Sequence, residues 1–434
     1  YAHLLAVETQ VSDLLARMEV NGMTYNLDVC KGHEEQILSY LSALEEEAHG
    51  IAGESFNLRS HPQLLSIFYD KLRAPQMTAK KTVDETRLAA FEKLEKMPRV
   101  SRMATLILSH RKASQLHSKW IDAEWLHKAK LCERKSRGAV QVHCSWNQTG
   151  TATGRLSASN PNLQAVTKYK VNLSNGNKAV DVNVRSAFIP SQNDHLLLSM
   201  DYKSIELRIL AHLSADPQLI KILRESSDVF TALASTWFGS CGITCPSGSP
   251  REVSKRVAYA IIYGTSAMGL SKQLNIPVPK AQTLKRSFLG FFSGVGNFTT
   301  AVKTFARERG YVETILKRKR FLPTISSQDR GERESAERKA VNTVVQGSAA
   351  DLIKCAMVRW KNLSRDKRDM VGGTATLVAQ IHDELLFEIR DRGRIKEVAA
   401  KIRDMMCTVF KLKVPVEVNC QFGPSWGDLQ DLHF

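Results

Sequence analysis

The sequence predicts an α+β protein with several subdomains, and three features of the chain indicate this class. Apolar residues recur at helical spacing in residues 3–48 and 102–130. From Val140 the pattern changes to short strands and turns, and the apolar runs 377–381 and 385–389 predict a hairpin. A chain of 434 residues is long enough to form more than one substructure around a large core.

The charge balance indicates a polyanionic partner. Lys and Arg number 61 against 44 Asp and Glu, which gives a formal net charge of +17. Such a positive field favours nucleic acid or an anionic membrane surface. No run of about 18 apolar residues is present, so no transmembrane helix is expected, and no signal peptide is visible. The chain starts at Tyr1 instead of Met, so we expect a piece of a longer protein.

The eight cysteines are scattered along the chain. Only Cys241 and Cys245 are close together, in a segment rich in Gly, Pro and Ser. A zinc site needs about four ligands, and no second pair stands at a suitable spacing. We therefore expect free thiols.

Local signals divide the N-terminal helical region. The Asn-Gly pair at 21–22 predicts a turn within residues 3–48. Ser60 is expected to cap a helix whose first turn contains Pro62. Residues 82–85, Thr-Val-Asp-Glu, match a capping box before a further helix.

Three polar segments are candidates for ligand contacts. Residues 128–137 are strongly cationic, which is typical either of a solvated loop or of a loop that follows phosphates. Residues 146–157 and 160–164 are rich in small and amide side chains. Small residues let a backbone approach a ligand closely, and Arg, Asn and Gln can bind phosphates or base edges.

Two carboxylates stand where predicted strands end. The apolar run 195–201 ends in Asp201 and is followed by a predicted helix from Ser204, so Asp201 is either a metal ligand or a helix cap. The predicted hairpin carries His382, Asp383 and Glu384 at its tip. Three adjacent titratable residues between buried flanks indicate a functional site.

Residues 251–264 predict a helix that Gly264 ends. Arg251, Lys255, Tyr259 and Tyr263 recur every four residues and form a slowly turning stripe of roughly 18 Å. Two cations at the N-terminal end suit a polyphosphate, and two aromatic rings suit a sugar and a base. Taken alone, such a stripe is more often a solvated face with core tyrosines, so its neighbours in the sequence decide.

Several motifs together resemble those of family A DNA polymerases. Residues 201–208 resemble motif A, residues 251–264 resemble motif B, and His382 to Glu384 resemble motif C. Further segments resemble the template–primer, fingers and palm motifs: residues 151–157, 162–164, 310–323 and 336–351. The motifs follow the family order and cover about residues 100–430. Residues 146–150, 377–387 and 425–427 are most similar to the polymerase nu and theta group, and residues 147–150 and 377–381 favour nu.

The resemblance implies a right-hand polymerase fold with an antiparallel palm sheet, helical fingers and a helical thumb. The implied subdomains are a segment that joins an absent exonuclease-like domain (1–29), the thumb (30–139), a first palm segment with motif A (140–215), the fingers with motif B (216–340) and a second palm segment with motif C (341–434). No cluster of exonuclease carboxylates is present, so no proofreading is expected.

The implied activity is template-directed addition of deoxynucleotides to a primer 3′ end by phosphoryl transfer with two Mg²⁺ ions. The implied metal ligands are Asp201, Asp383 and the backbone carbonyl of Tyr202. Lys255 is the implied third catalytic residue, because it neutralises or protonates pyrophosphate, and Arg251 holds the triphosphate with it.

The resemblance also assigns binding residues. The implied nucleotide-binding residues are Arg251, Lys255, Tyr259, Tyr263, Glu206 and Tyr202. Glu206 would exclude a ribose 2′-hydroxyl, Tyr259 would favour acceptance of dideoxynucleotides, and Tyr263 would lie by the templating base. The implied DNA-binding residues are Arg155, Asn162, Gln164, Gln346, Asn342, His382, Arg256, Arg318 and Arg320. Arg256 either binds a displaced base of a mismatch or only solvent and template phosphate; both interpretations stay open.

Four positions depart from the family pattern. Lys203 and Ser204 replace the usual Ser-Gln of motif A, Phe230 replaces a frequent His, and Lys317 replaces a usual Gly. None of them removes a catalytic carboxylate, so we expect an active enzyme.

The expected partners are primer-template DNA and deoxynucleoside triphosphates, for a nuclear monomer without membrane attachment. The expected role is DNA repair or translesion synthesis, and the alternative is a mitochondrial or organellar replicative polymerase of the same family. A single-subunit RNA polymerase is disfavoured by Glu206, and an inactive DNA-binding scaffold is disfavoured by Asp201, Asp383 and Lys255.

Overall fold

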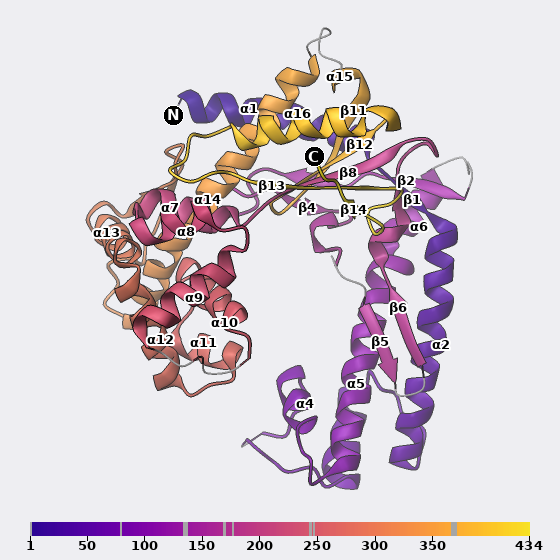
Figure 1. The fold of residues 1–434 in the computed structure, drawn as a ribbon. Coiled ribbons are helices and arrows are strands. Elements are labelled where there is room, and N and C mark those ends of the chain that lie inside the picture. The colour runs from indigo at the N-terminus through magenta and orange to yellow at the C-terminus, as the bar shows by residue number, and fades with distance from the viewer. Residues whose placement is uncertain are drawn as a thin grey trace.

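The computed structural model describes residues 2–78, 80–132, 138–167, 171–175, 178–242, 245, 248–365 and 371–434. A five-stranded sheet forms the centre of the molecule, and two arms extend from it on the same side (Figure 1). One arm consists of the long helices that follow the N-terminal helix. The other consists of the short helices between the two halves of the sheet.

The central sheet is antiparallel throughout and has the order β11-β12-β8-β13-β14. Its strands are β8 (Leu196–Tyr202), β11 (Ala375–Ile381), β12 (Glu384–Ile389), β13 (Val418–Gly423) and β14 (Gln430–Asp431). The predicted hairpin is confirmed as β11–β12, and β8 is the predicted apolar strand that carries Asp201. In the register, Asp201 lies opposite Glu384 on one side and Asn419 on the other. The sheet therefore brings together segments that are far apart in the sequence.

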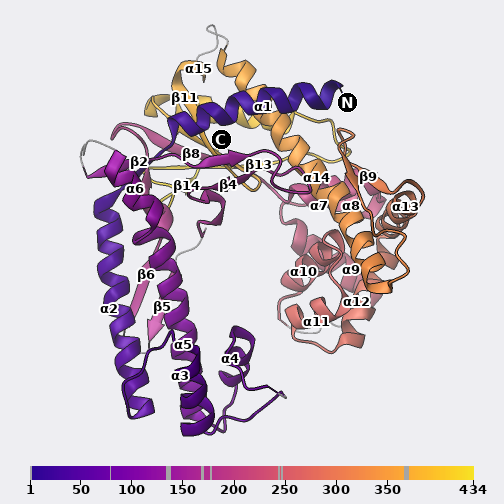
Figure 2. The same ribbon diagram turned by 180° about the vertical axis from the view of Figure 1, so that it is seen from behind.

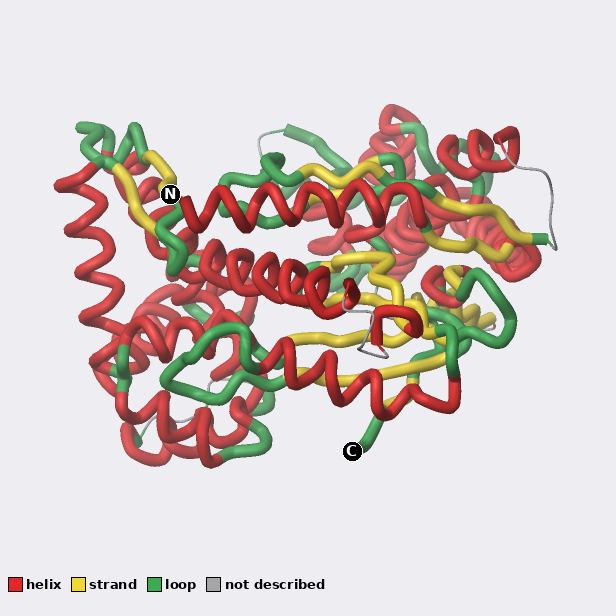
Figure 3. The backbone as a smooth tube through the Cα atoms, turned by 90° about the horizontal axis from the view of Figure 1, so that it is seen from above, coloured by secondary structure: helices red, strands yellow, loops and turns green. Residues whose placement is uncertain are grey.

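Helices cover the sheet on the side away from the two arms. They are α1 (Ala2–Asn21), α14 (Arg330–Arg365) and α16 (Ile395–Cys407). Seen from above, α1 runs alongside α14 (Figure 3), and the two helices are in contact. Trp360 of α14 packs edge-on against Phe387 of β12 at 4.8 Å between ring centroids. This packing explains why β12 and β8 are apolar over nearly their whole length.

The first arm is helical, as predicted. Its elements are α2 (Leu27–Ala52), α3 (His61–Leu65), η1 (Ser66–Lys71), α4 (Glu85–Phe91), α5 (Pro98–Leu116), η2 (His117–Ile121) and α6 (Glu124–Cys132). A small sheet joins this arm to the centre through β1 (Met23–Asn26), β2 (Ala139–Val142) and β7 (Phe188–Ile189). The hairpin of β5 (Val171–Asn175) and β6 (Lys178–Val182) lies beside α2 and α5 (Figure 2).

The second arm contains the predicted motif B helix. Its elements are α7 (Ile205–Ser214), α8 (Pro217–Glu225), α9 (Val229–Cys241), α10 (Pro250–Ile262), α11 (Ala267–Leu274), α12 (Val278–Phe291), α13 (Ser293–Arg309), β9 (Tyr311–Glu313) and β10 (Lys319–Phe321). Gly264 follows α10 with φ 63, a left-handed conformation that ends the helix as predicted. Short elements complete the described chain: β3 (Ser145–Asn147), β4 (Ser157–Ser159), η3 (Leu163–Ala165), η4 (Val184–Ala187), α15 (Val371–Thr374) and η5 (Arg392–Arg394).

Three local predictions for the N-terminal half were wrong in part. The turn at 21–22 is present, but the strand β1 follows it before α2 begins, because β2 and β7 supply its partners. Asp84, not Thr82, caps α4 by accepting a hydrogen bond from the backbone N–H of Arg87. Ser60 precedes α3 with a proline in its first turn, but its side chain makes no cap hydrogen bond.

The cysteines and the helices agree with two further expectations. Seven cysteines in the described part of the chain are free thiols. Among the described helices, none combines the length and the hydropathy that crossing a membrane requires. Of the cationic segment 128–137, the first residues belong to α6, and residues 133–137 lie outside the described part.

Candidate active site

The fold places the two predicted catalytic aspartates side by side. Asp201 is the last residue but one of β8, and Asp383 lies in the tight turn between β11 and β12. The backbone N–H of Tyr202 donates a hydrogen bond to the carbonyl of Asp383 at 3.1 Å. His382 takes φ 55 in this turn, which lets the chain reverse within two residues. The antiparallel register therefore determines where the two carboxylates meet.

The carboxyl group of Asp383 has an unmet hydrogen-bonding capacity. Its Oδ1 is buried and has no hydrogen-bond partner among the described residues. The Arg155 Nη2 lies 3.6 Å from this oxygen. Burial raises the pKa of Asp383 to about 7; Arg155 opposes this shift, and Glu206 and Asp201 add to it. A carboxylate oxygen with spare capacity beside a second carboxylate fits a divalent cation, which would satisfy the first and neutralise both.

The residues present fit Mg²⁺ as a cation that shares its ligand shell with the substrate. No group of three or more His, Cys, Asp or Glu side chains with metal-binding spacing exists within the described ranges. A cation between Asp201 and Asp383 would therefore need backbone carbonyl, water or substrate oxygens as well. Mg²⁺ characteristically keeps such ligands.

Glu384 is engaged on the other side of the hairpin. Its Oε1 accepts hydrogen bonds from the Ser199 hydroxyl at 2.6 Å and from the Trp426 indole at 3.2 Å. The Arg185 guanidinium lies 3.6 Å from its Oε2 and stacks over the Trp426 ring at 3.8 Å. This buried network holds β8, β12 and the C-terminal segment together. Its four residues are too far apart along the chain for any local pattern to link them.

A cavity of about 550 Å³ opens beside Asp383, within the range for small-molecule sites, while Asp201 lines a neighbouring cavity that Asp383 shares. The first of these cavities lies between α10 and the β11–β12 hairpin. Its lining includes Arg155, Glu206, Lys255, Arg256, Tyr259, Tyr263, Gln273, His382 and Asp383. Most of the residues that the motifs predicted to bind the nucleotide thus share one cavity.

The stripe along α10 has the predicted cations and rings. The Arg251 guanidinium donates to Asp228 at 2.8 Å and lies 5.9 Å from the Phe230 ring centroid. The Lys255 ammonium lies 5.8 Å from the same ring. Phe230, which replaces a frequent His of the family, thus provides an aromatic face beneath both cations. Further along, the rings of Tyr259 and Tyr263 stack at 5.8 Å with an interplanar angle of 16°.

Glu206 connects two other residues that line the cavity, Arg155 and Tyr263, by accepting hydrogen bonds from both. It is 3% exposed, and its two oxygens accept hydrogen bonds from Arg155 Nη2 at 2.6 Å and from the Tyr263 hydroxyl at 2.7 Å. Burial and the Glu206 charge raise the pKa of Tyr263 far above its ordinary value. They also raise the pKa of Tyr259 to about 12. Both phenols are therefore protonated donors at neutral pH.

Six of the nine predicted DNA contacts lie around the aspartates, next to η3 or on α14. Arg155, Gln164 and His382 lie around the aspartates, and Gln164 donates to the backbone carbonyl of Gln380 at 3.2 Å. Next to η3, Asn162 accepts a hydrogen bond from the backbone N–H of Gln164. Two others, Asn342 and Gln346, follow each other by one turn on α14, and both are half-buried.

The other three predicted DNA contacts bind protein groups. Arg256 donates to the backbone carbonyl of Gln273 on α11, at the cavity wall. Arg320 donates to the Thr343 hydroxyl at 2.7 Å. Arg318 turns inward, 19% exposed in its side chain, and pairs with carboxylates. Their roles toward DNA stay predictions.

The departures from the family pattern have local structural counterparts. Lys203 pairs with Glu417 at 3.5 Å. Ser204 takes φ 49 before α7, and Lys317 takes φ 64, which explains why glycine suits the latter position. Lys203 is thus held by an ion pair, while Ser204 and Lys317 adopt a left-handed conformation that glycine would favour.

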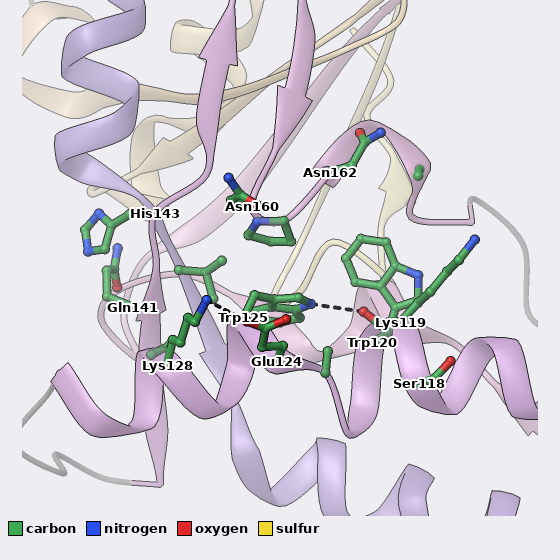
Figure 4. Close-up of a pocket in the computed structure, with 15 residues that line it drawn as sticks. Ser118, Lys119, Trp120, Glu124, Trp125, Lys128, Gln141, His143, Asn160 and Asn162 are labelled. Carbon is green, nitrogen blue, oxygen red and sulfur yellow. Dashed lines mark hydrogen bonds and ion pairs between the residues drawn. The ribbon is translucent and has the colours of Figure 1, made fainter.

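A larger cavity, of about 960 Å³, lies at the base of the first arm (Figure 4). It is framed by Trp120, Trp125 and the Asn160–Asn162 turn, and Asn162 lies at its edge. The Trp125 indole already donates to the backbone carbonyl of Lys119, and Lys128 pairs with Glu124 at 2.6 Å. The cavity includes neither aspartate, so the chemistry places the candidate site in the smaller one.

The comparisons with known proteins agree with these motifs. A model of DNA polymerase family A matches residues 27–428. The DNA polymerase I of Geobacillus stearothermophilus is 33% identical over 425 residues, which cover 98% of this chain and 46% of that protein. The thermostable DNA polymerase I of Thermus thermophilus is 36% identical over 423 residues, with coverages of 97% and 47%. The chain thus spans about half the length of the curated relatives it matches.

A solved structure has the same fold. It is the POL domain of Pol1 from M. smegmatis in complex with DNA primer-template and dNTP, with a TM-score of 0.81 and 32% identity. The match covers 97% of this chain and 70% of that one. The expected right-hand fold, with an antiparallel sheet and helical arms, is confirmed by this similarity.

Proposed function

The chain belongs to DNA polymerase family A, and from this premise we propose that it is a template-directed DNA polymerase. In this proposal it adds deoxynucleotides to a primer 3′ end. The observation that carries the proposal is the meeting of Asp201 and Asp383, together with the place of Asp383 in a cavity that Lys255, Tyr259 and Tyr263 of α10 also line. A bacterial structure of similar fold was solved with DNA primer-template and dNTP, which supports the same ligands here. In this assignment the central sheet is the palm, the first arm the thumb and the second arm the fingers.

In this proposal, different residues of the site bind the metal and the triphosphate during phosphoryl transfer. Asp201, Asp383 and the Tyr202 carbonyl would hold Mg²⁺, which when bound lowers the pKa of the primer hydroxyl and neutralises the leaving pyrophosphate. Arg251 and Lys255 bind the triphosphate from the α10 side. Lys255 also supplies charge or a proton to the departing pyrophosphate.

The aromatic end of α10 and Glu206 would select the sugar and the base. Both oxygens of Glu206 accept hydrogen bonds from Arg155 and Tyr263, so the position of the carboxylate is fixed. A ribose 2′-hydroxyl next to this fixed carboxylate would clash with it. This supports discrimination against ribonucleotides, and therefore favours DNA synthesis over RNA synthesis.

Primer extension on a defined template tests the proposal. The purified chain should extend a primer with deoxynucleotides in Mg²⁺, should not extend it in EDTA, and should use ribonucleotides poorly. Efficient ribonucleotide incorporation would favour an RNA polymerase instead. DNA binding without extension would favour an inactive scaffold.

The finer assignments are also proposals. The similarity of residues 146–150, 377–387 and 425–427 to the polymerase nu and theta group supports a nu-like enzyme in DNA repair or translesion synthesis. We propose further that this chain itself does not proofread and that the protein works as a nuclear monomer. The organellar replicative polymerase is the alternative. Imaging of the tagged full-length protein discriminates them: mitochondrial or plastid signal would contradict the nuclear assignment. Bypass of a template lesion by the chain would support the repair role.

A further inference from the structure

A buried cluster of four charges lies behind the candidate site, where α1 crosses α14. Lys354 Nζ lies 2.9 Å and 3.0 Å from the two carboxylate oxygens of Glu8. Arg318 pairs with Glu8 as well and donates to Asp351 from Nε at 3.0 Å and from Nη2 at 2.9 Å. Lys354 is 1% exposed and Asp351 is 0% exposed. Arg318 and Glu8 are each 19% exposed in their side chains. Two cations and two carboxylates thus balance each other in a site that is buried at Lys354 and Asp351 and partly open at Glu8 and Arg318.

The loop between β3 and β4 rests on this cluster. Gln148 donates to the backbone carbonyl of Glu8 at 2.8 Å and also to its carboxylate. Gly154 has φ +80, and a Cβ built there would lie 2.6 Å from Arg318 Nε. The loop backbone is therefore pressed against the guanidinium, and only glycine permits that approach.

The opposite side of the loop is held by α14. A Cβ at Gly347 would lie 3.0 Å from the backbone carbonyl of Thr153. Thr314, from the β9–β10 hairpin, contacts the same glycine and donates to Asp351. The loop is thus confined between α14 and the charge cluster just before Arg155.

Arg155 has few side-chain contacts of its own to fix it. Its Nη2 donates to Glu206 at 2.6 Å and lies 3.6 Å from Asp383, while its Nε is buried without a hydrogen-bond partner in the described chain. The direction of this guanidinium therefore depends on the backbone that carries it.

We propose that Glu8 is a positioning residue for Arg155, acting through the charge cluster and the β3–β4 loop. The inference deepens the proposed function and rests on it. Glu8 lies on α1, ahead of residues 27–428 that the family model matches. Removing its charge leaves Arg318 and Lys354 against Asp351 alone, a buried imbalance that favours displacement of the guanidinium from under Gly154.

A double-mutant cycle tests the inference. Glu8→Gln should lower kcat for correct insertion roughly ten- to hundredfold, as small misplacements of catalytic groups do, with a smaller effect on KM. In an Arg155→Ala background, the same substitution should lower kcat less than about twofold further, because the two residues act in one path. Equal factors in both backgrounds would show a general structural effect and overturn the inference.

Two further variants keep the test decisive if Glu8→Gln folds poorly. Gln148→Ala removes the loop contact and leaves the buried charges balanced, and it should show the same lack of additivity with Arg155→Ala. Asp13→Asn is the matched control, because Asp13 also ties α1 to α14, through Lys361 at 2.8 Å and Arg365 at 3.2 Å, at a distance from the loop. Its effect should be small and additive.

Amide hydrogen exchange separates this inference from the proposed activity. Exchange in residues 149–156 should rise in Glu8→Gln and Gln148→Ala and should stay at the wild-type rate in Asp13→Asn. Unchanged exchange in the first two variants would overturn the inference whether or not the chain extends primers. Absence of extension by the wild-type chain would overturn the proposed function alone.

Discussion

At the scale of single residues, burial sets the properties of the site. Asp383 is buried beside a second carboxylate, and Glu206 holds two donors while it is almost inaccessible to solvent. The arrangement of Asp383 does not stabilise a metal-free protein, because it keeps negative charge away from water, whereas Glu206 is balanced by Arg155. In the proposed function, a bound cation would neutralise Asp383, and Glu206 would contact the sugar of a bound nucleotide.

Replacement of Asp383 by Asn should stabilise the metal-free chain near pH 8. Burial raises the pKa of Asp383 from 3.8 to about 7, so the folded protein holds a proton that the unfolded chain releases. The wild type should therefore lose stability as pH rises from about 4 through about 7, and the variant should lack this loss. Thermal unfolding in EDTA at several pH values measures it. An equal gain for Asp201→Asn would show that burial of Asp383 is not the cause.

Replacement of Glu206 by Ala should raise ribonucleotide use. The methyl group leaves space beside the sugar and frees Arg155 and Tyr263 from their shared acceptor. Competition between a ribonucleotide and the matching deoxynucleotide in primer extension gives the ratio of kcat/KM values. An unchanged ratio would remove Glu206 as the sugar gate. Tyr259→Phe serves as control, because it alters the same wall and should instead weaken acceptance of dideoxynucleotides.

At the scale of elements, α10 and the β11–β12 hairpin were predictable because their signals are local. The four-residue recurrence from Arg251 and the stop at Gly264 both appear in the structure. The strand β1 was not predictable, since four residues between two helices become a strand only by pairing with Ala139–Val142 and Phe188–Ile189. Burial by distant partners overrides the local pattern there.

The α10–α11 contact bears on fidelity. Arg256 donates to the Gln273 carbonyl and lines the cavity, so its guanidinium lies near the place of the nascent pair in the proposed function. A wobble pair moves acceptors into the major groove, where a guanidinium can bind them. Arg256→Ala should lower misinsertion of T opposite G by roughly tenfold, the value of one charge-assisted hydrogen bond, with correct insertion little changed. Steady-state insertion kinetics at fixed salt measure both, and an equal fall in both would leave Arg256 only as a phosphate contact.

At the scale of the whole molecule, the motifs predicted the pairing of Asp201 with Asp383 but not the support behind it. The contacts of Glu8 with Arg318 and Lys354 span separations of 310 and 346 residues, and no spacing rule connects such positions. For the same reason the sequence indicates a DNA contact at Arg318, while the fold turns this side chain toward carboxylates. Long-range charge pairs are visible only once the helices are packed.

The net charge of +17 and the two aspartates predict separate properties of the same protein. Affinity for DNA should come mainly from phosphate contacts by cations spread over both arms, and should fall steeply with salt. Catalysis should depend on Asp201 and Asp383, the carboxylates that would hold Mg²⁺ in the proposed function. The two properties can therefore be separated by substitution.

The most direct test compares the extension rate and the primer-template Kd of Asp201→Ala and Asp383→Ala with those of the wild-type chain at fixed salt. Extension in Mg²⁺ should be abolished in both variants while the Kd for DNA stays nearly unchanged. Extension within about tenfold of wild type by either variant would contradict the assignment of these aspartates as the metal-holding pair.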